Sequence, residues 1–351
     1  MLNMNLETVV QMTDMDKKNS KDYVIRSDQI DIGNGVTDMY AAIGNWSFGI
    51  NKYAHNQIAE KLGIPSSYYN KMLEKNELKL LTQNINTWLA KEPEKKRLVR
   101  VLDGNVRAFL SSRFRCIDNN DVLMLALQQL KGLNCEVKQC YLTDSNLYLK
   151  AVTPQIQGEV KVGDIVQQGI VLRNSEVGAG ALRVEPMIWR LACSNGMIMA
   201  TALKEIHIGR DMDLGADWRS DITIQNENKL ILSRVNDIIA ATFSGKFMDE
   251  YLEKAKYGAS IEIKAPIELL DSVAVHFDMT DQQKKDILTS FINQKDTTMW
   301  GLSNSITAVA KEQDNIDEQI RLEEVGYKTL SLQIPKLKNS EFLDFSGGVQ
   351  A

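Results

Sequence analysis

A short turn signal constrains the fold of this chain more than any other local feature. Residues 97–115 read RLVRVLDGNVRAFLSSRFR, in which two β-prone runs flank Asp103 and Gly104. An Asp-Gly pair tolerates the positive φ angles that a tight turn between antiparallel strands requires. The sequence therefore predicts a β-hairpin over about residues 97–115.

Helical and strand patterns surround this hairpin. Apolar residues recur at helical spacing in two helices around Gly63 and Pro65, and again over residues 76–91, 118–130, 218–256 and 280–291. Strand signals occur at 136–139, 147–152 and 165–174, whereas residues 183–199 fit either a strand or a buried helix. The predicted fold is α+β: an antiparallel β-sheet with the hairpin at its centre, packed by helices, plus a mostly helical C-terminal part.

The same patterns suggest a domain division. The chain of 351 residues is long enough for one elaborated domain or for two. The expected parts are a flexible N-terminal arm at residues 1–20, an α+β core domain at 21–215, a mostly helical part packed on the core at 216–334, and a flexible tail at 335–351.

Composition narrows the classes of function. No run of about 18 apolar residues is present, so no membrane span is expected. The four cysteines and three histidines form no metal-ligand motif, and we expect neither a metal nor a cofactor. The N-terminus resembles no secretory leader. The expected location is the cytoplasm of a bacterial host, with a virion as the alternative.

The hairpin is unusually basic. Between residues 91 and 115 there are eight Lys or Arg against three acids, in a chain whose net charge is −5. Alternate side chains of a strand share a face, so the odd-numbered arginines are expected on one side; these are Arg97, Arg107, Arg113 and Arg115, with Arg100 beside them. Such a face suits the phosphates of a nucleic acid, and Phe109 and Phe114 suit unpaired bases. The alternative is a solvated surface hairpin with both phenylalanines in the core.

A second basic stretch lies between residues 173 and 195. Arg173 and Arg183 are expected to contact phosphates, with Arg190 as a further candidate, and Gly178 and Gly180 allow close approach of the backbone to a ligand. Glu176 fits a catalytic acid, or more commonly the partner of an arginine.

Three stretches resemble a known family. They are RLVRVLDGNVRAFLSSRFRCIDNNDVL at 97–123, GIVLRNSEVGAGALRVEPMIWRLACSNGMI at 169–198, and TTMWGLSNSITAVAKEQ with LEEVGY between 297 and 327. With their spacing they cover most of residues 40–330. They resemble the phage/plasmid-like proteins of Domain of Unknown Function family 932, and the resemblance implies service to mobile DNA. The family is also similar in architecture to single-strand annealing proteins such as Redβ, RecT, Erf and the eukaryotic Rad mediators, from which no active residue carries over.

The preferred function is sequence-independent binding of single-stranded DNA or RNA by a homo-oligomer, with strand annealing in phage or plasmid replication and recombination. The alternatives are a non-catalytic phage structural or host-interaction protein, and a Mg²⁺-dependent nuclease. The nuclease rests only on the triplets Glu262-Ile263-Lys264 and Glu159-Val160-Lys161, because phosphate-loop, hydrolase and deaminase motifs are missing. We therefore expect no catalytic residue. The expected nucleic-acid-binding residues are Arg97, Arg100, Arg107, Arg113, Arg115, Arg173, Arg183, Phe109 and Phe114.

Overall fold

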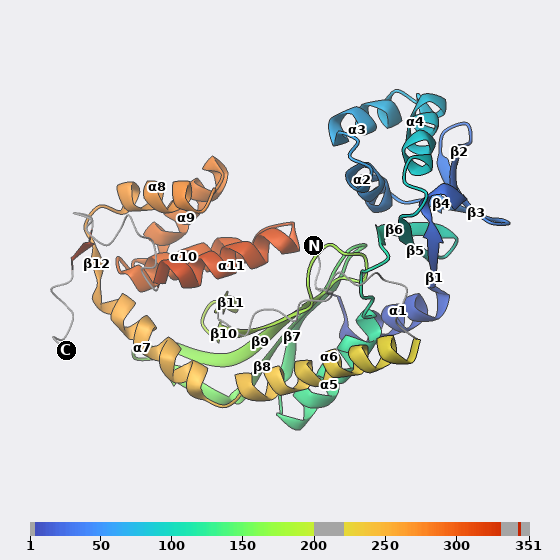
Figure 1. Cartoon of the computed structure of the whole chain (residues 1–351). Helices are drawn as coiled ribbons and strands as arrows, with labels where there is room; N and C mark the ends of the chain where they lie inside the picture. The colour runs from blue at the N-terminus through green and yellow to red at the C-terminus, as the bar shows by residue number, and fades with distance from the viewer. Residues whose placement is uncertain (1–3, 200–220, 331–342, 345–351) are drawn as a thin grey trace.

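The chain folds into two β-sheets and a largely helical C-terminal region (Figure 1). A computed structural model describes residues 4–199, 221–330 and 343–344. The first sheet has six strands in the order β1-β5-β6-β4-β3-β2 and is mixed, because β4 and β6 run parallel. Its strands are β1 (Lys21–Arg26), β2 (Ile30–Asn34), β3 (Met39–Ile43), β4 (Trp46–Ile50), β5 (Lys96–Leu102) and β6 (Asn105–Ser111).

The predicted hairpin is confirmed and lies in the middle of this sheet. Strands β5 and β6 pair antiparallel, and the turn between them consists of Asp103 and Gly104 with φ angles of 48° and 78°. Two consecutive positive φ angles give the turn whose twist matches that of the flanking strands. The expectation of one wholly antiparallel sheet is too simple, because the chain forms a second sheet and the first one is mixed.

Three helices cover one face of the first sheet: α2 (Lys52–Lys61), α3 (Ser66–Glu74) and α4 (Leu78–Ala90). Apolar residues such as Ile58 and Leu81 pack there against Ile32 and Val99 of the strands. The sequence prediction of two helices around Gly63, followed by a third, is confirmed. The short 3-10 helix η1 (Ser27–Gln29) connects β1 to β2.

The second sheet is an antiparallel half-barrel of five strands in the order β11-β10-β9-β8-β7. Its strands are β7 (Glu136–Leu142), β8 (Leu147–Glu159), β9 (Ile165–Asn174), β10 (Arg183–Arg190) and β11 (Asn195–Ile198). The stretch 183–199, which fitted either element, therefore contains strands. Neighbouring residues of β8 point to opposite faces: Leu149 packs toward helices α5 (Asn119–Gly132) and α6 (Asp221–Thr242), and Tyr148 toward Ile320.

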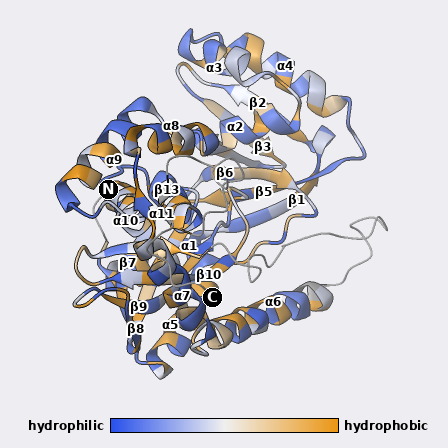
Figure 2. Cartoon of the chain, turned by 90° about the vertical axis from the view of Figure 1, so that its left-hand side faces the viewer, coloured by the Kyte–Doolittle hydropathy of each residue, from blue (hydrophilic) through white to orange (hydrophobic). Residues whose placement is uncertain are grey.

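The C-terminal region is helical. It comprises α7 (Lys246–Ser260), α8 (Pro266–His276), α9 (Asp281–Gln294), α10 (Met299–Lys311) and α11 (Ile316–Leu330), with a small pair of strands, β12 (Glu262–Ile263) and β13 (Leu343–Asp344). The single long helix expected to reach about residue 256 is divided between Thr242, where α6 ends, and Lys246, where α7 begins; Gly245 in this break has a φ of 87°. Polar and apolar residues are mixed along α6 (Figure 2). No helix of the described residues is long and apolar enough to span a bilayer.

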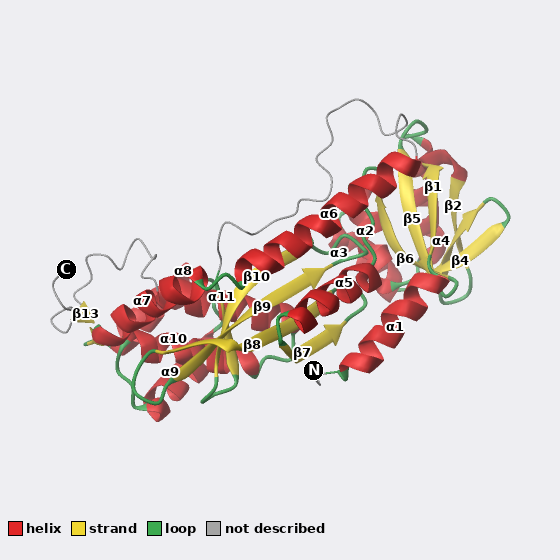
Figure 3. Cartoon of the chain, turned by 90° about the horizontal axis from the view of Figure 1, so that it is seen from below, coloured by secondary structure: helices red, strands yellow, loops and turns green. Residues whose placement is uncertain are grey.

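The N-terminal arm expected at residues 1–20 differs from the structure, which has helix α1 over Leu6–Asn19. The Asn5 side chain caps this helix, and Val9 is buried against α5. The helix lies between the two sheets (Figure 3). The Met4 N–H donates to the Cys140 carbonyl of β7, and the Asn19 side chain donates to Asp103 of the hairpin turn. Most of the expected tail at 335–351 lies outside the described residues.

The hairpin turn gives a stability prediction. We expect Gly104→Ala to lower the free energy of unfolding by about 1 kcal/mol, because alanine is strained at positive φ. The matched control is Gly132→Ala, which also meets open space but lies at the end of α5 without a positive φ. Chemical denaturation of both variants measures the difference, and equal midpoints would contradict it.

Candidate functional site

The arginines of the hairpin lie inside the protein. Arg97 is buried on the helix-covered face of the first sheet, where it pairs with Glu92 and bonds the Ser27 hydroxyl at 3.2 Å. Its guanidinium lies 5.5 Å from the ring centroid of Phe109, which is itself a core residue. Neither side chain is therefore exposed for phosphate binding or base stacking.

Arg100 and Arg107 meet at Glu176, which follows β9. Arg107 pairs with the Glu176 carboxylate at 3.0 Å, and Arg100 donates to its backbone carbonyl at 2.9 Å. Arg100 also pairs with Asp22 at 2.8 Å and with Asp118 at 3.0 Å. The β5–β6 register shifts after Arg100, and Arg107 is the extra residue of this bulge. Simple alternation therefore fails, and the one-sided track of odd-numbered arginines does not form.

The remaining predicted residues are scattered. Arg115 pairs with Glu227 of α6, and Arg173 pairs with Glu185 at 2.6 Å and with Glu324 at 3.0 Å. Arg183 is half-buried opposite Arg173 in the strand register, and Arg113 is exposed after β6. Phe114 is half-buried and packs beside Leu110 and Val177. The structure thus does not bring the predicted set together on one surface.

Glu176 instead links the two sheets. Its carboxylate accepts a bond of 2.5 Å from the Asn119 N–H at the start of α5, where negative charge is favourable. Asp118 occupies the N-cap position of this helix but makes no side-chain cap bond, because its carboxylate accepts from Arg100. Burial raises the pKa of Glu176, and the Arg107 charge opposes that rise. The expected pairing of Glu176 with an arginine is confirmed.

The residue after Glu176 extends the link. Gln57 of α2 donates to the Val177 carbonyl at 2.7 Å and accepts from the Phe109 N–H at 2.8 Å. A single buried side chain therefore connects α2, β6 and the loop after β9. Bonds of this kind between buried polar groups fix the relative position of the elements that carry them.

A second buried cluster joins the half-barrel to α11. Lys150 of β8 bonds both carboxylate oxygens of Glu323 at 2.6 and 2.7 Å, and each side chain is only 1% exposed. Burial lowers the pKa of Lys150, and Glu323 opposes that change. Tyr148 donates to Asp317 on the same helix. This cluster was missed from the sequence because its partners are 173 residues apart.

A third cluster connects the half-barrel to α10. Asp164 accepts two bonds from Arg190, at 2.6 and 2.9 Å, and one from the Trp300 indole at 2.9 Å. Asn195 donates to the Thr307 hydroxyl at 2.5 Å. Arg190 is therefore also engaged internally.

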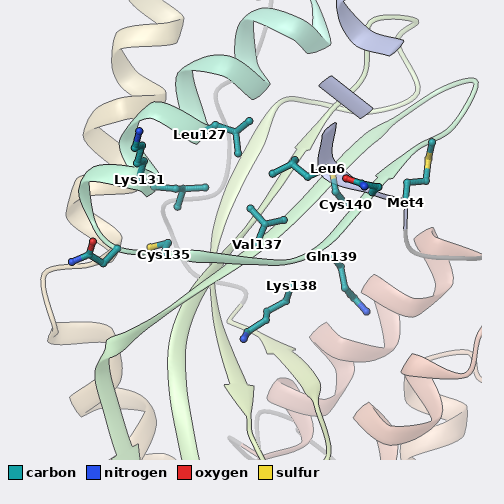
Figure 4. A pocket seen from close by; sticks show the side chains of 12 residues that line it. Met4, Leu6, Leu127, Lys131, Cys135, Val137, Lys138, Gln139 and Cys140 are labelled. Carbon is teal, nitrogen blue, oxygen red and sulfur yellow. The ribbon is translucent and has the colours of Figure 1, made fainter. Parts of the chain in front are cut away.

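A cavity of about 770 Å³ lies beside the outer edge of β7 (Figure 4). Leu6, Leu127 and Val137 supply apolar lining, and Lys131 and Lys138 supply positive charge. None of its lining residues is an acid or a histidine, so the lining offers no carboxylate or imidazole for general base catalysis. Across the residues that the structure describes, no group of three or more His, Cys, Asp or Glu is placed to hold a metal ion.

Comparison with known protein families gives a match over much of the chain. The model of the family described as "Domain of unknown function (DUF932)" matches residues 108–328, which is more than half of the chain. The chain belongs to the DUF932 family. The DUF932 match includes the end of β6, the half-barrel and most of the C-terminal helical region, but it excludes the whole 40–107 region that the sequence resemblance also covered. No curated protein and no solved structure gives a significant match.

The Arg107–Glu176 pair gives a second stability prediction. We expect Arg107→Met to lower the free energy of unfolding by about 3 kcal/mol, because it leaves a buried carboxylate with one partner fewer. Adding Glu176→Gln is expected to cost less than the sum of the two single changes. Thermal and chemical denaturation measure both effects.

The control is Lys18→Met, which removes an exposed ion pair with Asp14 and is expected to change stability far less. Strict additivity of the two changes at the buried pair would show that Arg107 and Glu176 do not interact.

Proposed function

We propose that this protein binds single-stranded nucleic acid without covalent chemistry, through the exposed face of α4 and not through the hairpin arginines. The function is the one expected from the sequence, but the binding site is a different one. The site differs because five of the seven arginines of the predicted set are paired with carboxylates of the protein itself.

The exposed face of α4 carries the observation that supports the proposal. Trp88 is 42% exposed, and the Lys91 ammonium lies 4.4 Å from the centroid of its ring. Leu80 and Asn84 precede them at spacings of eight and four residues from Trp88, so all four share one side of the helix. An aromatic ring beside a lysine suits a nucleotide, because the ring can stack on a base while the ammonium contacts its phosphate.

The charge around this face is favourable. Residues 66–91 contain four lysines against two glutamates, a local excess of two positive charges in a chain of net charge −5. Lys71, Lys75 and Lys79 are exposed where α3 ends and α4 begins. Several cations near one strand of phosphates strengthen binding by releasing counterions.

We also propose that the protein anneals strands during phage or plasmid recombination in the bacterial cytoplasm. Annealing would follow if the bound strand kept its base edges exposed. The relation to single-strand annealing proteins stays a prediction.

The competing function is that of a host-interaction or structural protein. It is favoured by Leu80, which is 49% exposed on the same face of α4 as Trp88.

Oligonucleotide binding tests the proposal. We expect the protein to bind a labelled single-stranded oligonucleotide, with an affinity that falls steeply as salt rises. The combined change Trp88→Ala and Lys91→Ala is expected to weaken binding at least tenfold, because stacking contributes roughly 1–3 kcal/mol per base. Fluorescence anisotropy at two salt concentrations measures both effects.

The matched control is Trp46→Ala on β4, which removes another exposed tryptophan that is not part of α4 and is expected to leave affinity unchanged. Equal loss in both variants would place binding elsewhere. No measurable affinity of the unchanged protein for single strands would refute the function and favour the protein-interaction alternative.

A further inference from the structure

The outer edges of the two sheets differ in how they are protected. On β2, the Asn86 side chain of α4 accepts from the Ile32 N–H at 2.9 Å and donates to the Ile32 carbonyl at 3.0 Å, as a neighbouring strand would. A side-chain amide therefore occupies that edge. Unprotected edges are a hazard that proteins usually manage in this way.

The two edges of the half-barrel are also protected. The Met4 N–H donates to the Cys140 carbonyl of β7. A register shift between Val137 and Gln139 distorts the same strand. Strand β11 has only four residues and lies against α10 and α11. Short, bulged or covered strands are poor templates for pairing with another chain.

Strand β1 is different. It has six residues and pairs with β5 in one regular register without a bulge. The Ser27 N–H donates to the Lys95 carbonyl, which extends that register. Because bonded pairs alternate along an antiparallel ladder, the N–H and C=O of Asp22, Val24 and Arg26 point away from β5. Within the described residues, no hydrogen bond is found to the outward N–H groups or to the C=O of Asp22 and Val24, whereas the Arg26 C=O accepts the first bond of η1.

We infer that β1 is the interface for a second copy of this chain, with the two β1 strands antiparallel around a twofold axis at Val24. In this register the outward backbone groups of one copy face those of the other, so that the two six-stranded sheets become continuous. This inference goes beyond the proposed function and does not depend on nucleic-acid binding.

The side chains of β1 fit this register. Asp22 of each copy lies opposite Arg26 of the other, so charges of opposite sign meet twice, beside the partners that each already has within its own chain, Arg100 and Asp28. Val24, which is 62% exposed, lies opposite its own equivalent and becomes covered. Tyr23 and Ile25, half-buried against the first core, lie opposite each other across the axis. Opposite charges and apolar pairs across strands stabilise sheet pairing.

Measurement of the molar mass tests the inference. We expect the full chain, without nucleic acid, to form a dimer in sedimentation equilibrium. Val24→Lys is expected to abolish the dimer, because it places two ammonium groups against each other at the axis. Val24→Pro should do the same by removing an outward N–H, a change that edge strands tolerate.

The matched control is Val162→Lys, which replaces a fully exposed valine between β8 and β9 and should leave the dimer intact. Circular dichroism checks that each variant folds. A monomeric unchanged protein, or a dimer that persists in both Val24 variants, overturns the inference.

Amide hydrogen exchange gives a readout that needs no variant. The Val24 amide should be protected at high protein concentration and exchange faster on dilution, whereas the inward Tyr23 amide should stay protected. Fast exchange of Val24 at every concentration also overturns the inference.

Discussion

The burial of Glu176 is the constraint on which the arrangement of the two sheets depends. A carboxylate removed from water is costly unless charges and donors surround it, and this one receives Arg107, the start of α5 and, through its own backbone, Arg100. These partners come from the hairpin and from the helix that covers the half-barrel. The first sheet and the half-barrel therefore have one favourable relative position, in which all of these groups are satisfied together.

The same principle explains why a basic sequence does not make a basic surface. The stretches that resemble the family supply both members of several buried contacts: Arg107 meets Glu176, and Asn195 meets Thr307. Lys150 likewise needs Glu323, because an unpaired ammonium at that depth would be strongly destabilising. A cluster of charged residues in the sequence therefore predicts a charged surface only where the partners of those charges are also known.

Local sequence signals predicted much of the fold, whereas contacts between residues far apart in the sequence could not be predicted. The Asp103-Gly104 turn, the helices around Gly63 and the strands of the half-barrel follow from neighbours in sequence. Helix α1 was missed because its burial depends on α5, more than a hundred residues away. The predicted face of arginines does not form because of one bulge in β6. A single extra residue there reverses the alternation of side chains on which the prediction depended.

The family match begins at residue 108, and that position lies within β6. Strand β6 occupies the centre of the first sheet, between β5 and β4, whose residues precede the match. A recombinant fragment trimmed to the family limits would carry a truncated β6 without either neighbour, and its hydrophobic side chains would face solvent. The limits of sequence similarity in this chain are therefore not the limits of an independently folding unit, and expression plasmids should retain the segment from α1 onward.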